Sequence, residues 1–201
     1  MLIISNVAKI KNKNKYNVTI DNKCYTFDED IILEYKLLKN HEIDDDILNK
    51  ALESNDLHDY YEKALSYALK YAKSSNEVYY YLIDKGLDNE KAKEIVNKLM
   101  ERKLIDDKKL IEGLVYSLVR NYNGKLMIYE KLKQKRYDKK LIDEAISNID
   151  YDLYFEALNN LYNKIKSKYD KYDDYVRKNK IKQYLYQRGY EYSDINEINI
   201  K

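Results

Sequence analysis

The sequence contains no proline and no tryptophan, and it has only four glycines, one cysteine and two histidines in 201 residues. Because proline and glycine are so scarce, helices meet few breakers and can be long. The single cysteine, Cys24, excludes an internal disulfide and is typical of a reducing compartment. The opening MLIISNVAKI has neither a basic n-region nor a long apolar run. We therefore predict no signal peptide and no membrane span, and we expect a cytoplasmic protein.

Charged residues make up 36% of the chain and hydrophobic residues 44%. This balance is too apolar for a disordered chain, and a chain of this length can bury a core. Tyrosine is abundant, but its abundance alone does not indicate nucleic-acid binding. The composition therefore favours a folded protein that is rich in helix.

One short pattern occurs three times: a leucine, two further residues, and then a lysine or arginine before a bend. It is found in YLIDKGLD, KLKQKRYD and YLYQRGYE, and its leucines are Leu82, Leu132 and Leu185. Their spacings are 50 and 53 residues, and self-similarity at a nearly fixed period is typical of repeat proteins. We interpret the pattern as the end of the middle helix in each of three repeats.

Each repeat is predicted to contain three short helices. In the first repeat, apolar residues at helical spacing mark the first helix, and Ser74 and Glu77 fit a capping box at the start of the second. Gly86 is placed to end that second helix in a left-handed conformation. The predicted caps of the helices that follow are Asp88, Asp106, Asp138 and Asp150, and the apolar positions predicted for the first helix are Ala64, Leu65, Ala68, Leu69 and Ala72.

The residues before the repeats predict a different structure. Tyr16, Val18 and Ile20 alternate with polar residues, DNK at 21–23 is typical of a turn, and a second apolar stretch covers 24–27. We expect a small β-hairpin or a three-stranded piece there. The helices after it are expected to start at about Asp28 and Asp44.

The predicted fold class is mainly α. We expect an elongated, curved array of three tandem three-helix repeats, with a small β-hairpin and helical extension at the N-terminus. The expected divisions are an N-terminal accessory cap at 1–56 and repeats at 57–105, 106–149 and 150–201. Stacking extends a core that a single repeat is too small to form.

Several short motifs follow one another along the last two thirds of the chain. They are E-x4-L-x2-K-G from Glu77, LIDD at 104–107, G-K-x2-I-x3-L-x2-K from Gly124, and L-x2-R-G-Y from Leu185. In their order and spacing, over residues 60–200, these motifs resemble the RecX family of bacterial recombinase regulators. No single motif is diagnostic, and the order carries the resemblance.

The chain departs from the family pattern at three places. It has only Lys73 where the family usually has arginines before the first capping box, and it has Leu110 and Ile111 where the family has an aromatic residue and alanine. Arg136 stands where a glycine is common, so the middle helix of the second repeat is expected to end without a left-handed glycine. These departures affect individual contacts more than membership.

The resemblance implies a protein without chemistry of its own. RecX proteins bind the RecA recombinase, lie along the groove of the RecA–single-stranded DNA filament, and mostly suppress its ATPase activity, strand exchange and growth. The implied partner is therefore the RecA filament, and the implied role is in homologous recombination, DNA repair and the SOS response. We expect a monomer that needs no cofactor.

Charge is distributed unevenly, although the whole chain has a net charge of only +2. Residues 120–140 and residues 164–188 each have a local net charge of +6, whereas residues 28–62 have a net charge of −9. A basic face suits an acidic filament groove or a nucleic-acid backbone, and it speeds encounter by electrostatic steering. The residues predicted to contact the filament are Arg120, Lys125, Lys131, Lys135, Arg136, Lys178, Lys182 and Arg188.

A DNA-binding module is the main alternative, because helix-turn-helix proteins are also built from short helices joined by tight turns. Against it, the chain shows no evident recognition helix rich in Arg, Asn and Gln, and its acidic first quarter would repel phosphate. Weak, sequence-independent contact with DNA is compatible with both functions. A third alternative, a purely structural scaffold, predicts that charge reversal within 120–140 changes nothing measurable.

Little in the sequence supports catalysis or metal binding. His41 and His58 lie in the acidic N-terminal region with no cysteine close by, and the segment 44–55 lacks the glycine and glutamate that an EF-hand needs at its sixth and twelfth positions. The four glycines are too far apart to form a phosphate-binding loop. We therefore predict no catalytic, cofactor or metal site.

Overall fold

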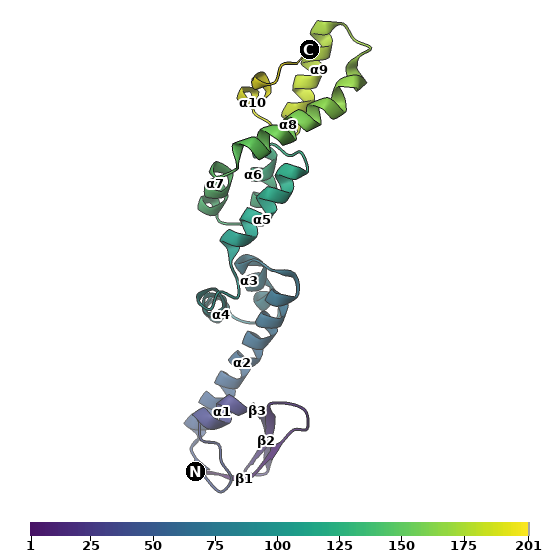
Figure 1. Cartoon of the computed structure of the whole chain (residues 1–201). Coiled ribbons are helices and arrows are strands. Elements are labelled where there is room, and N and C mark those ends of the chain that lie inside the picture. The colour runs from purple at the N-terminus through teal and green to yellow at the C-terminus, as the bar shows by residue number, and fades with distance from the viewer. Residues whose placement is uncertain (201) are drawn as a thin grey trace. The chain divides into compact units, whose positions relative to one another are not determined.

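The computed structural model describes residues 1–200, with the exception of the side chain of Tyr71. The chain is mainly helical with a small sheet near its N-terminus, which confirms the predicted fold class (Figure 1). It forms two compact units. Unit 1 comprises residues 1–73 and 77–104, and unit 2 comprises residues 74–76 and 105–201. The curvature of the predicted array stays a prediction.

The sheet has four antiparallel strands in the order β3-β2-β1-β4. The predicted hairpin is confirmed: Ile20 pairs with Lys23, and the turn residues Asp21 and Asn22 both have positive φ, as a tight two-residue hairpin turn requires. The two-residue β4 is too short to produce an alternating pattern, so the sequence did not reveal it. The strands are β1 (Leu2–Lys9), β2 (Lys15–Ile20), β3 (Lys23–Asp28) and β4 (Glu42–Ile43).

Two helices follow the β2–β3 hairpin where the sequence predicts them, with β4 between them. Asp28 precedes α1 (Glu29–Glu34), and the Asp44 carboxylate accepts a hydrogen bond from the Ile47 N–H at the start of α2 (Asp45–Tyr71). The helix α2 has 27 residues, so the predicted division between residues 56 and 57 lies inside it. One helix therefore contributes both to the sheet region and to the first repeat.

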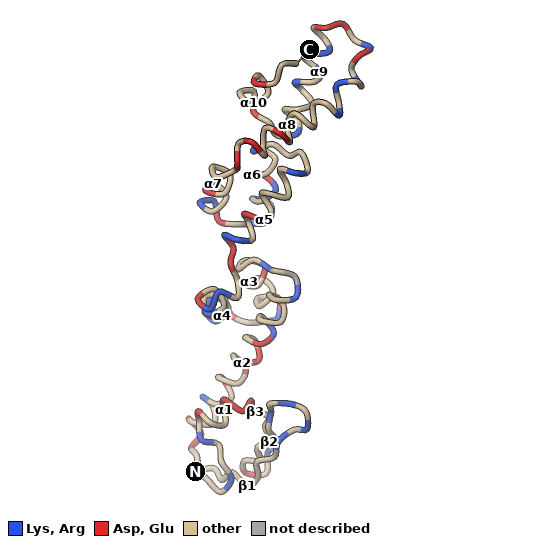
Figure 2. Tube along the Cα trace, viewed as in Figure 1, with Lys and Arg blue, Asp and Glu red and all other residues tan. Residues whose placement is uncertain are grey.

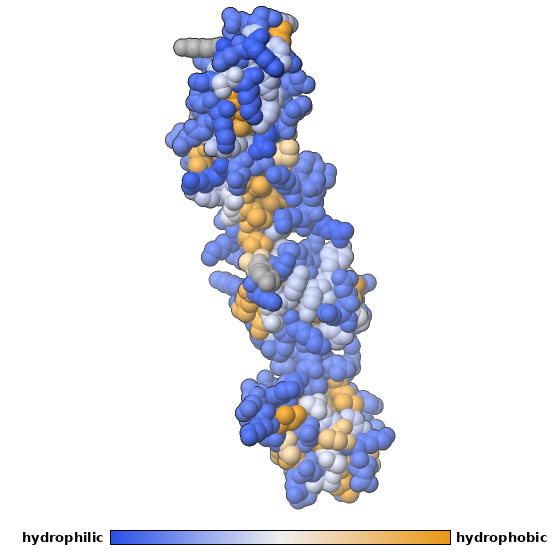
Figure 3. Space-filling model, turned by 90° about the vertical axis from the view of Figure 1, so that its right-hand side faces the viewer, coloured by the Kyte–Doolittle hydropathy of each residue, from blue (hydrophilic) through white to orange (hydrophobic). Residues whose placement is uncertain are grey.

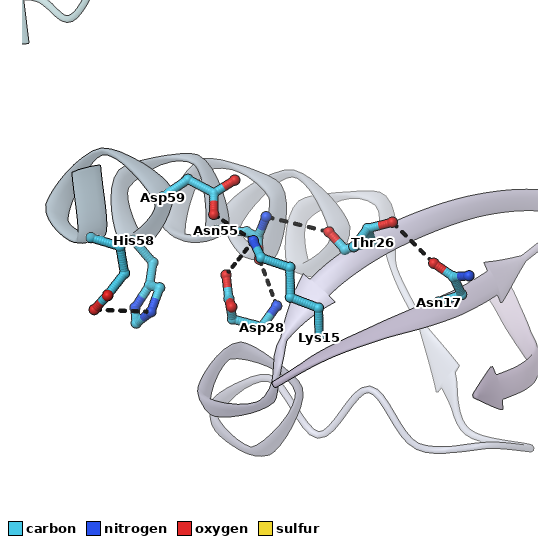
Figure 4. A network of polar contacts seen from close by, with 8 residues as sticks. Lys15, Asn17, Thr26, Asp28, Asn55, His58 and Asp59 are labelled. Atoms are coloured by element: carbon cyan, nitrogen blue, oxygen red, sulfur yellow. Dashed lines mark hydrogen bonds and ion pairs between the residues drawn. The ribbon is translucent and has the colours of Figure 1, made fainter. Parts of the chain in front are cut away.

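A polar network attaches α2 to the sheet (Figure 4). The buried side chain of Asn55 accepts a hydrogen bond from the Asp28 N–H at 2.9 Å and donates one to the Thr26 carbonyl at 3.3 Å. The ammonium of Lys15 lies 3.1 Å from the Asp28 carboxylate and 2.5 Å from that of Asp59. These contacts fix the first half of α2 against β2 and β3.

The three repeats use successive groups of three helices. Their caps confirm the prediction, because Asp88, Asp106, Asp138 and Asp150 each accept a hydrogen bond from a backbone N–H in the first turn of the next helix. After α2 the helices are α3 (Ser75–Asp84), α4 (Asn89–Glu101), α5 (Asp107–Arg120), α6 (Lys125–Gln134), α7 (Lys139–Ser147), α8 (Tyr151–Ile165), α9 (Asp174–Gln187) and α10 (Tyr192–Glu197), with a short 3-10 turn η1 (Lys166–Tyr169) after α8.

The repeated leucine pattern is explained by one backbone geometry. Gly86, Arg136 and Gly189 all have left-handed φ, at 93°, 60° and 86°. In each case the N–H of the next residue donates to the carbonyl of the pattern's leucine, so Leu82, Leu132 and Leu185 accept equivalent bonds. Arg136 adopts this conformation without being a glycine, at a cost of about 1–2 kcal/mol.

The buried side chains form separate cores. One cluster lies around the sheet and includes Ile4, Phe27 and Leu37, whereas a larger one joins the buried residues of α5 to α10. The predicted stripe of α2 needs one correction: Ala64 and Ala68 are buried, but Leu69 is 60% exposed. On the face drawn in Figure 3 most of the surface is hydrophilic, and hydrophobic side chains gather in several patches.

Candidate interaction surface

The eight residues predicted to contact a partner all belong to unit 2. They lie at the end of α5, along α6 with its bend, and along α9, where Figure 2 shows basic residues in blue. Apart from Arg120 and Arg136, they fall into two groups. In the first group the charged head contacts buried side chains or backbone carbonyls of unit 2, and in the second group the charged head lies at the surface.

Arg188 belongs to the first group, because its guanidinium binds the end of α5. Its Nε donates to the Tyr122 carbonyl at 3.2 Å, and its Nη2 donates to the Asn121 carbonyl at 2.8 Å. A cation at a helix C-terminus is favourable, since the last carbonyls carry partial negative charge. The position of Arg188 therefore indicates a contact between the second and third repeats.

Backbone contacts reinforce this junction. The N–H of Gly124 donates to the Arg188 carbonyl at 2.8 Å, and the N–H of Leu126 donates to the Gly189 carbonyl at 3.1 Å. A Cβ on Gly124 would lie 2.1 Å from the carbonyl carbon of Gly189. Only glycine allows this approach, and it places the bend after α9 directly on the N-terminus of α6.

Lys125 and Lys131 lie at the same junction and are half-buried. The Lys131 ammonium donates to Oδ1 of the buried Asn123 at 2.9 Å, and the Lys125 ammonium lies 4.9 Å from the centroid of the Tyr154 ring. The structure thus brings Lys125, Lys131 and Arg188 together around the turn between α5 and α6. The charged groups of these three residues already contact Asn123, the Tyr154 ring and the last carbonyls of α5, so they are less available to a partner.

The hydroxyl of Tyr154 sits in the middle of this junction. It accepts a hydrogen bond from the Lys125 N–H at 3.3 Å and donates one to the Asp194 carboxylate at 2.9 Å. The side chain is 2% exposed, and burial raises the pKa of the phenol far above its usual value, since the charged form is poorly solvated there. Tyr154 therefore stays a neutral hydrogen-bonding link between α6, α8 and α10.

The second group is accessible. Lys135 and Lys178 are exposed, and the half-buried Lys182 donates to Oδ1 of Asn196 at 3.1 Å. Lys178 and Lys182 are four residues apart on α9, so they project from one side of this helix.

The two remaining arginines lie at the ends of α5 and α6. The guanidinium of Arg120 donates to the Tyr116 hydroxyl at 3.0 Å, and this hydrogen bond raises the pKa of the arginine. The backbone carbonyl of the exposed Arg136 accepts a hydrogen bond from the Asn76 side chain at 2.7 Å.

Sequence reasoning missed the tyrosines that accompany these cations. Tyr186 and Tyr192 stack with ring centroids 4.9 Å apart, and they are 45% and 56% exposed. Lys178, Lys182 and Tyr186 recur at intervals of four residues, so the spacing of α9 contained a signal for a mixed basic and aromatic face.

As far as the structure describes them, unit 1 and unit 2 lack a feature of metal sites and a feature of membrane spans. Among the residues that it describes, no cluster of three or more His, Cys, Asp or Glu side chains is arranged to hold a metal ion. None of the described helices combines the length and the apolar composition that a membrane-spanning segment needs.

The chain is similar to several known proteins. Residues 152–198 match the family described as "RecX, third three-helix domain". A protein named "Regulatory protein RecX" from Oceanobacillus iheyensis is 28% identical over 94% of this chain and 72% of its own length. A protein of the same name from Clostridium tetani is 27% identical over 97% of this chain and 93% of its own length.

Two solved structures are similar to the chain. The crystal structure of RecX from Lactobacillus salivarius is 28% identical, with a TM-score of 0.67 over 72% of this chain and 94% of that one. A crystal structure of a regulatory protein RecX has a TM-score of 0.86 over the full length of both chains, and at 23% identity it supports the fold. Sequence motifs, repeat geometry and these comparisons agree: the third repeat matches a RecX family model, and nearly the whole chain is similar to proteins named as RecX regulatory proteins.

Proposed function

We propose that this protein regulates the RecA recombinase, mostly as an inhibitor, in recombination and DNA repair in the cytoplasm. It binds along the groove of the RecA–single-stranded DNA filament and modulates ATPase activity, strand exchange and filament growth. The observation that carries the proposal is the similarity to RecX proteins over nearly the whole chain. The protein acts by binding, without a catalytic residue or cofactor of its own.

Three cations of unit 2 support this proposal: Lys135 and Lys178 are exposed, and the half-buried Lys182 donates to the exposed Asn196. Lys135, Lys178 and Lys182 present ammonium groups at the surface of α6 and α9, where they can approach an acidic groove and steer the encounter. Lys125, Lys131 and Arg188 are poorer candidates for direct contact, because their charged groups already lie against Tyr154, Asn123 and α5.

The second candidate function is sequence-independent DNA binding, for which the sequence suggests a helix-turn-helix-like module. We propose single-stranded DNA as the form that is bound. The exposed Tyr186–Tyr192 pair favours it, with Lys182 four residues before Tyr186 on α9, because proteins that bind single strands without sequence preference combine stacking aromatic rings with basic side chains.

The test is the single-stranded-DNA-dependent ATPase rate of RecA, with the protein titrated from far below equal stoichiometry. We expect the rate to fall at substoichiometric amounts. The variant Lys135→Glu/Lys178→Glu/Lys182→Glu should need at least about tenfold more protein for the same effect. Lys131 is left unchanged, since its bond to the buried Asn123 would confound the result.

A matched control carries the same change of charge elsewhere. Lys11, Lys23 and Lys39 are exposed residues of the N-terminal region, and their reversal to glutamate should leave the titration unchanged. No inhibition by the wild type, together with DNA binding by the protein alone, would favour the second candidate. Equal losses in both triple variants would mean that net charge matters and the positions on α6 and α9 do not.

A further inference from the structure

Unit 2 contains a groove that the basic side chains do not use. It lies between α5, α7 and α8 and has a volume of about 310 Å³. Its walls are apolar and come from Val115, Val119, Ala145, Ile149 and Leu153. A cavity of this size is at the lower end of the range for ligand sites, so it suits one large side chain better than a bulky cofactor.

The spacing of α5 explains how the groove arises. Glu112, Val115, Tyr116 and Val119 are at positions i, i+3, i+4 and i+7, so they share one face of the helix. Val115 and Val119 are 5% and 1% exposed and form the floor, whereas Tyr116 is 51% exposed. A large aromatic side chain thus stands open beside an apolar floor, as expected of a binding groove more than of a packed core.

Two carboxylates line this groove, and one cation, the Arg120 guanidinium, is held at the Tyr116 hydroxyl. The carboxylates are those of Glu112 and Asp150, and both residues are exposed. Asp150 is the N-cap of α8 and Asp152 lies in its first turn, where Figure 2 shows acidic residues in red. The carboxylates would repel a phosphate backbone and attract a cation, so the groove excludes nucleic acid and selects a basic partner.

We propose that this groove docks a protein segment in which a large apolar side chain is next to a lysine or arginine. The apolar side chain enters between Val115, Ala145 and Leu153, and its basic neighbour pairs with Glu112 or Asp150. The groove thus recognises protein, in contrast to the basic face of α9. Identification of the segment with part of the RecA filament rests on the proposed function, but the existence of the groove as a binding site does not.

Two probes that share a ring and differ in charge test the groove directly. Tryptamine carries an ammonium on its indole, and indole-3-acetate carries a carboxylate on the same ring. In a titration of the full-length ¹⁵N-labelled protein followed by NMR, tryptamine should shift the amide resonances of Val115, Ala145 and Ile149. We expect its dissociation constant to be at least about fivefold lower than that of indole-3-acetate. Equal affinities, or no shifts from either probe, would overturn the proposal.

A pair of variants tests whether Glu112 causes the preference for tryptamine over indole-3-acetate. Glu112→Lys should reduce the ratio between the two probes to below about two, because it replaces a lining carboxylate with an ammonium. Asp143→Lys is the matched control: it makes the same change at an exposed position of α7 that does not line the groove, and it should keep the ratio. If both variants behave alike, the rim charge does not select the ligand and the proposal is wrong.

The filament provides the second measurement. Glu112→Lys should weaken binding of the protein to RecA–single-stranded DNA filaments at least about fivefold, and Asp143→Lys should not. If the wild type selects tryptamine but binds no filament, the groove stands and the proposed function fails. If the wild type binds the filament and Glu112→Lys binds it equally well, the filament does not occupy this groove, and its identification as the partner is overturned.

Discussion

The guanidinium of Arg188 donates two hydrogen bonds to carbonyl oxygens at the end of α5, although it belongs to the last turn region of α9. Hydrogen bonds from a charged group contribute about 1.5–3 kcal/mol each, and those at a partly exposed position fall toward the lower end. We therefore expect Arg188→Met to lower the free energy of unfolding by about 2 kcal/mol, measured by urea denaturation.

Lys178→Met is the matched comparison at the residue scale. It also removes a positive charge from α9, but the Lys178 side chain is exposed, so the free energy of unfolding should change by less than about 0.5 kcal/mol. For RecA inhibition we expect the opposite order: Lys178→Met should weaken inhibition more than Arg188→Met, since the Lys178 side chain is accessible to a partner. A stable Arg188→Met protein that binds the filament poorly would show that Arg188 contacts the partner after all.

At the scale of elements, Gly124 allows the bend after α9 to rest on the start of α6. A methyl group on Gly124 would overlap the backbone of Gly189, which no side-chain movement can relieve. We expect Gly124→Ala to lower the free energy of unfolding by about 3 kcal/mol or more. Thermal unfolding followed by circular dichroism would measure this change.

Gly113 gives the opposite expectation for the same substitution. It lies inside α5, and apart from the adjacent residues and the backbone of its own helix no atom is within 4 Å of the place its Cβ would occupy. Gly113→Ala should therefore raise the free energy of unfolding by about 0.5–1 kcal/mol, because alanine is the better helix former. A similar result for both alanine variants would contradict the close packing of Gly124 against Gly189.

The elements also show how far the sequence predicts this structure. Asp88 and Asp138 act within three residues of their own position, so local spacing was enough to find these caps. By contrast, the contact between Arg188 and Tyr122 joins residues 66 positions apart. A sequence shows the charge of Arg188 but not its distant partner, and for this reason the predicted surface mixed structural cations with exposed ones.

Contacts between residues far apart in the sequence also explain why β4 and the apolar groove were not predicted. The strand β4 has two residues and owes its place to pairing with Leu2 and Ile3. The apolar groove beside Tyr116 is formed by three helices, and its residues appear in the sequence as ordinary helix positions.

At the scale of the whole molecule, the buried clusters described above do not share residues. The sheet cluster runs from Ile4 to Ala51, and the cluster of α5 to α10 runs from Ile111 to Ile200. Residues 74–76 group with the second cluster's unit, as shown by the Ser75 N–H, which donates to the Asp107 carboxylate at 2.8 Å. Each unit thus has its own source of stabilisation.

A fragment of residues 74–201 is therefore expected to fold by itself. It should show helical circular dichroism and one cooperative thermal transition, since it keeps the entire second cluster. A fragment of residues 124–201 is the control. It lacks Ile111, Val115 and Val119, which α5 contributes to that cluster, and it should lose the cooperative transition.

The fragment 74–201 also tests where the partner binds. It contains every cation of the predicted surface and the groove between α5, α7 and α8, so we expect it to bind RecA filaments within about threefold of the full-length affinity, measured by fluorescence anisotropy at fixed salt. A cooperatively folded fragment whose affinity is more than about tenfold weaker would assign essential contacts to residues 1–73. The location of the partner site on α5 to α9 would then be wrong, whereas RecA regulation by the whole protein would stand.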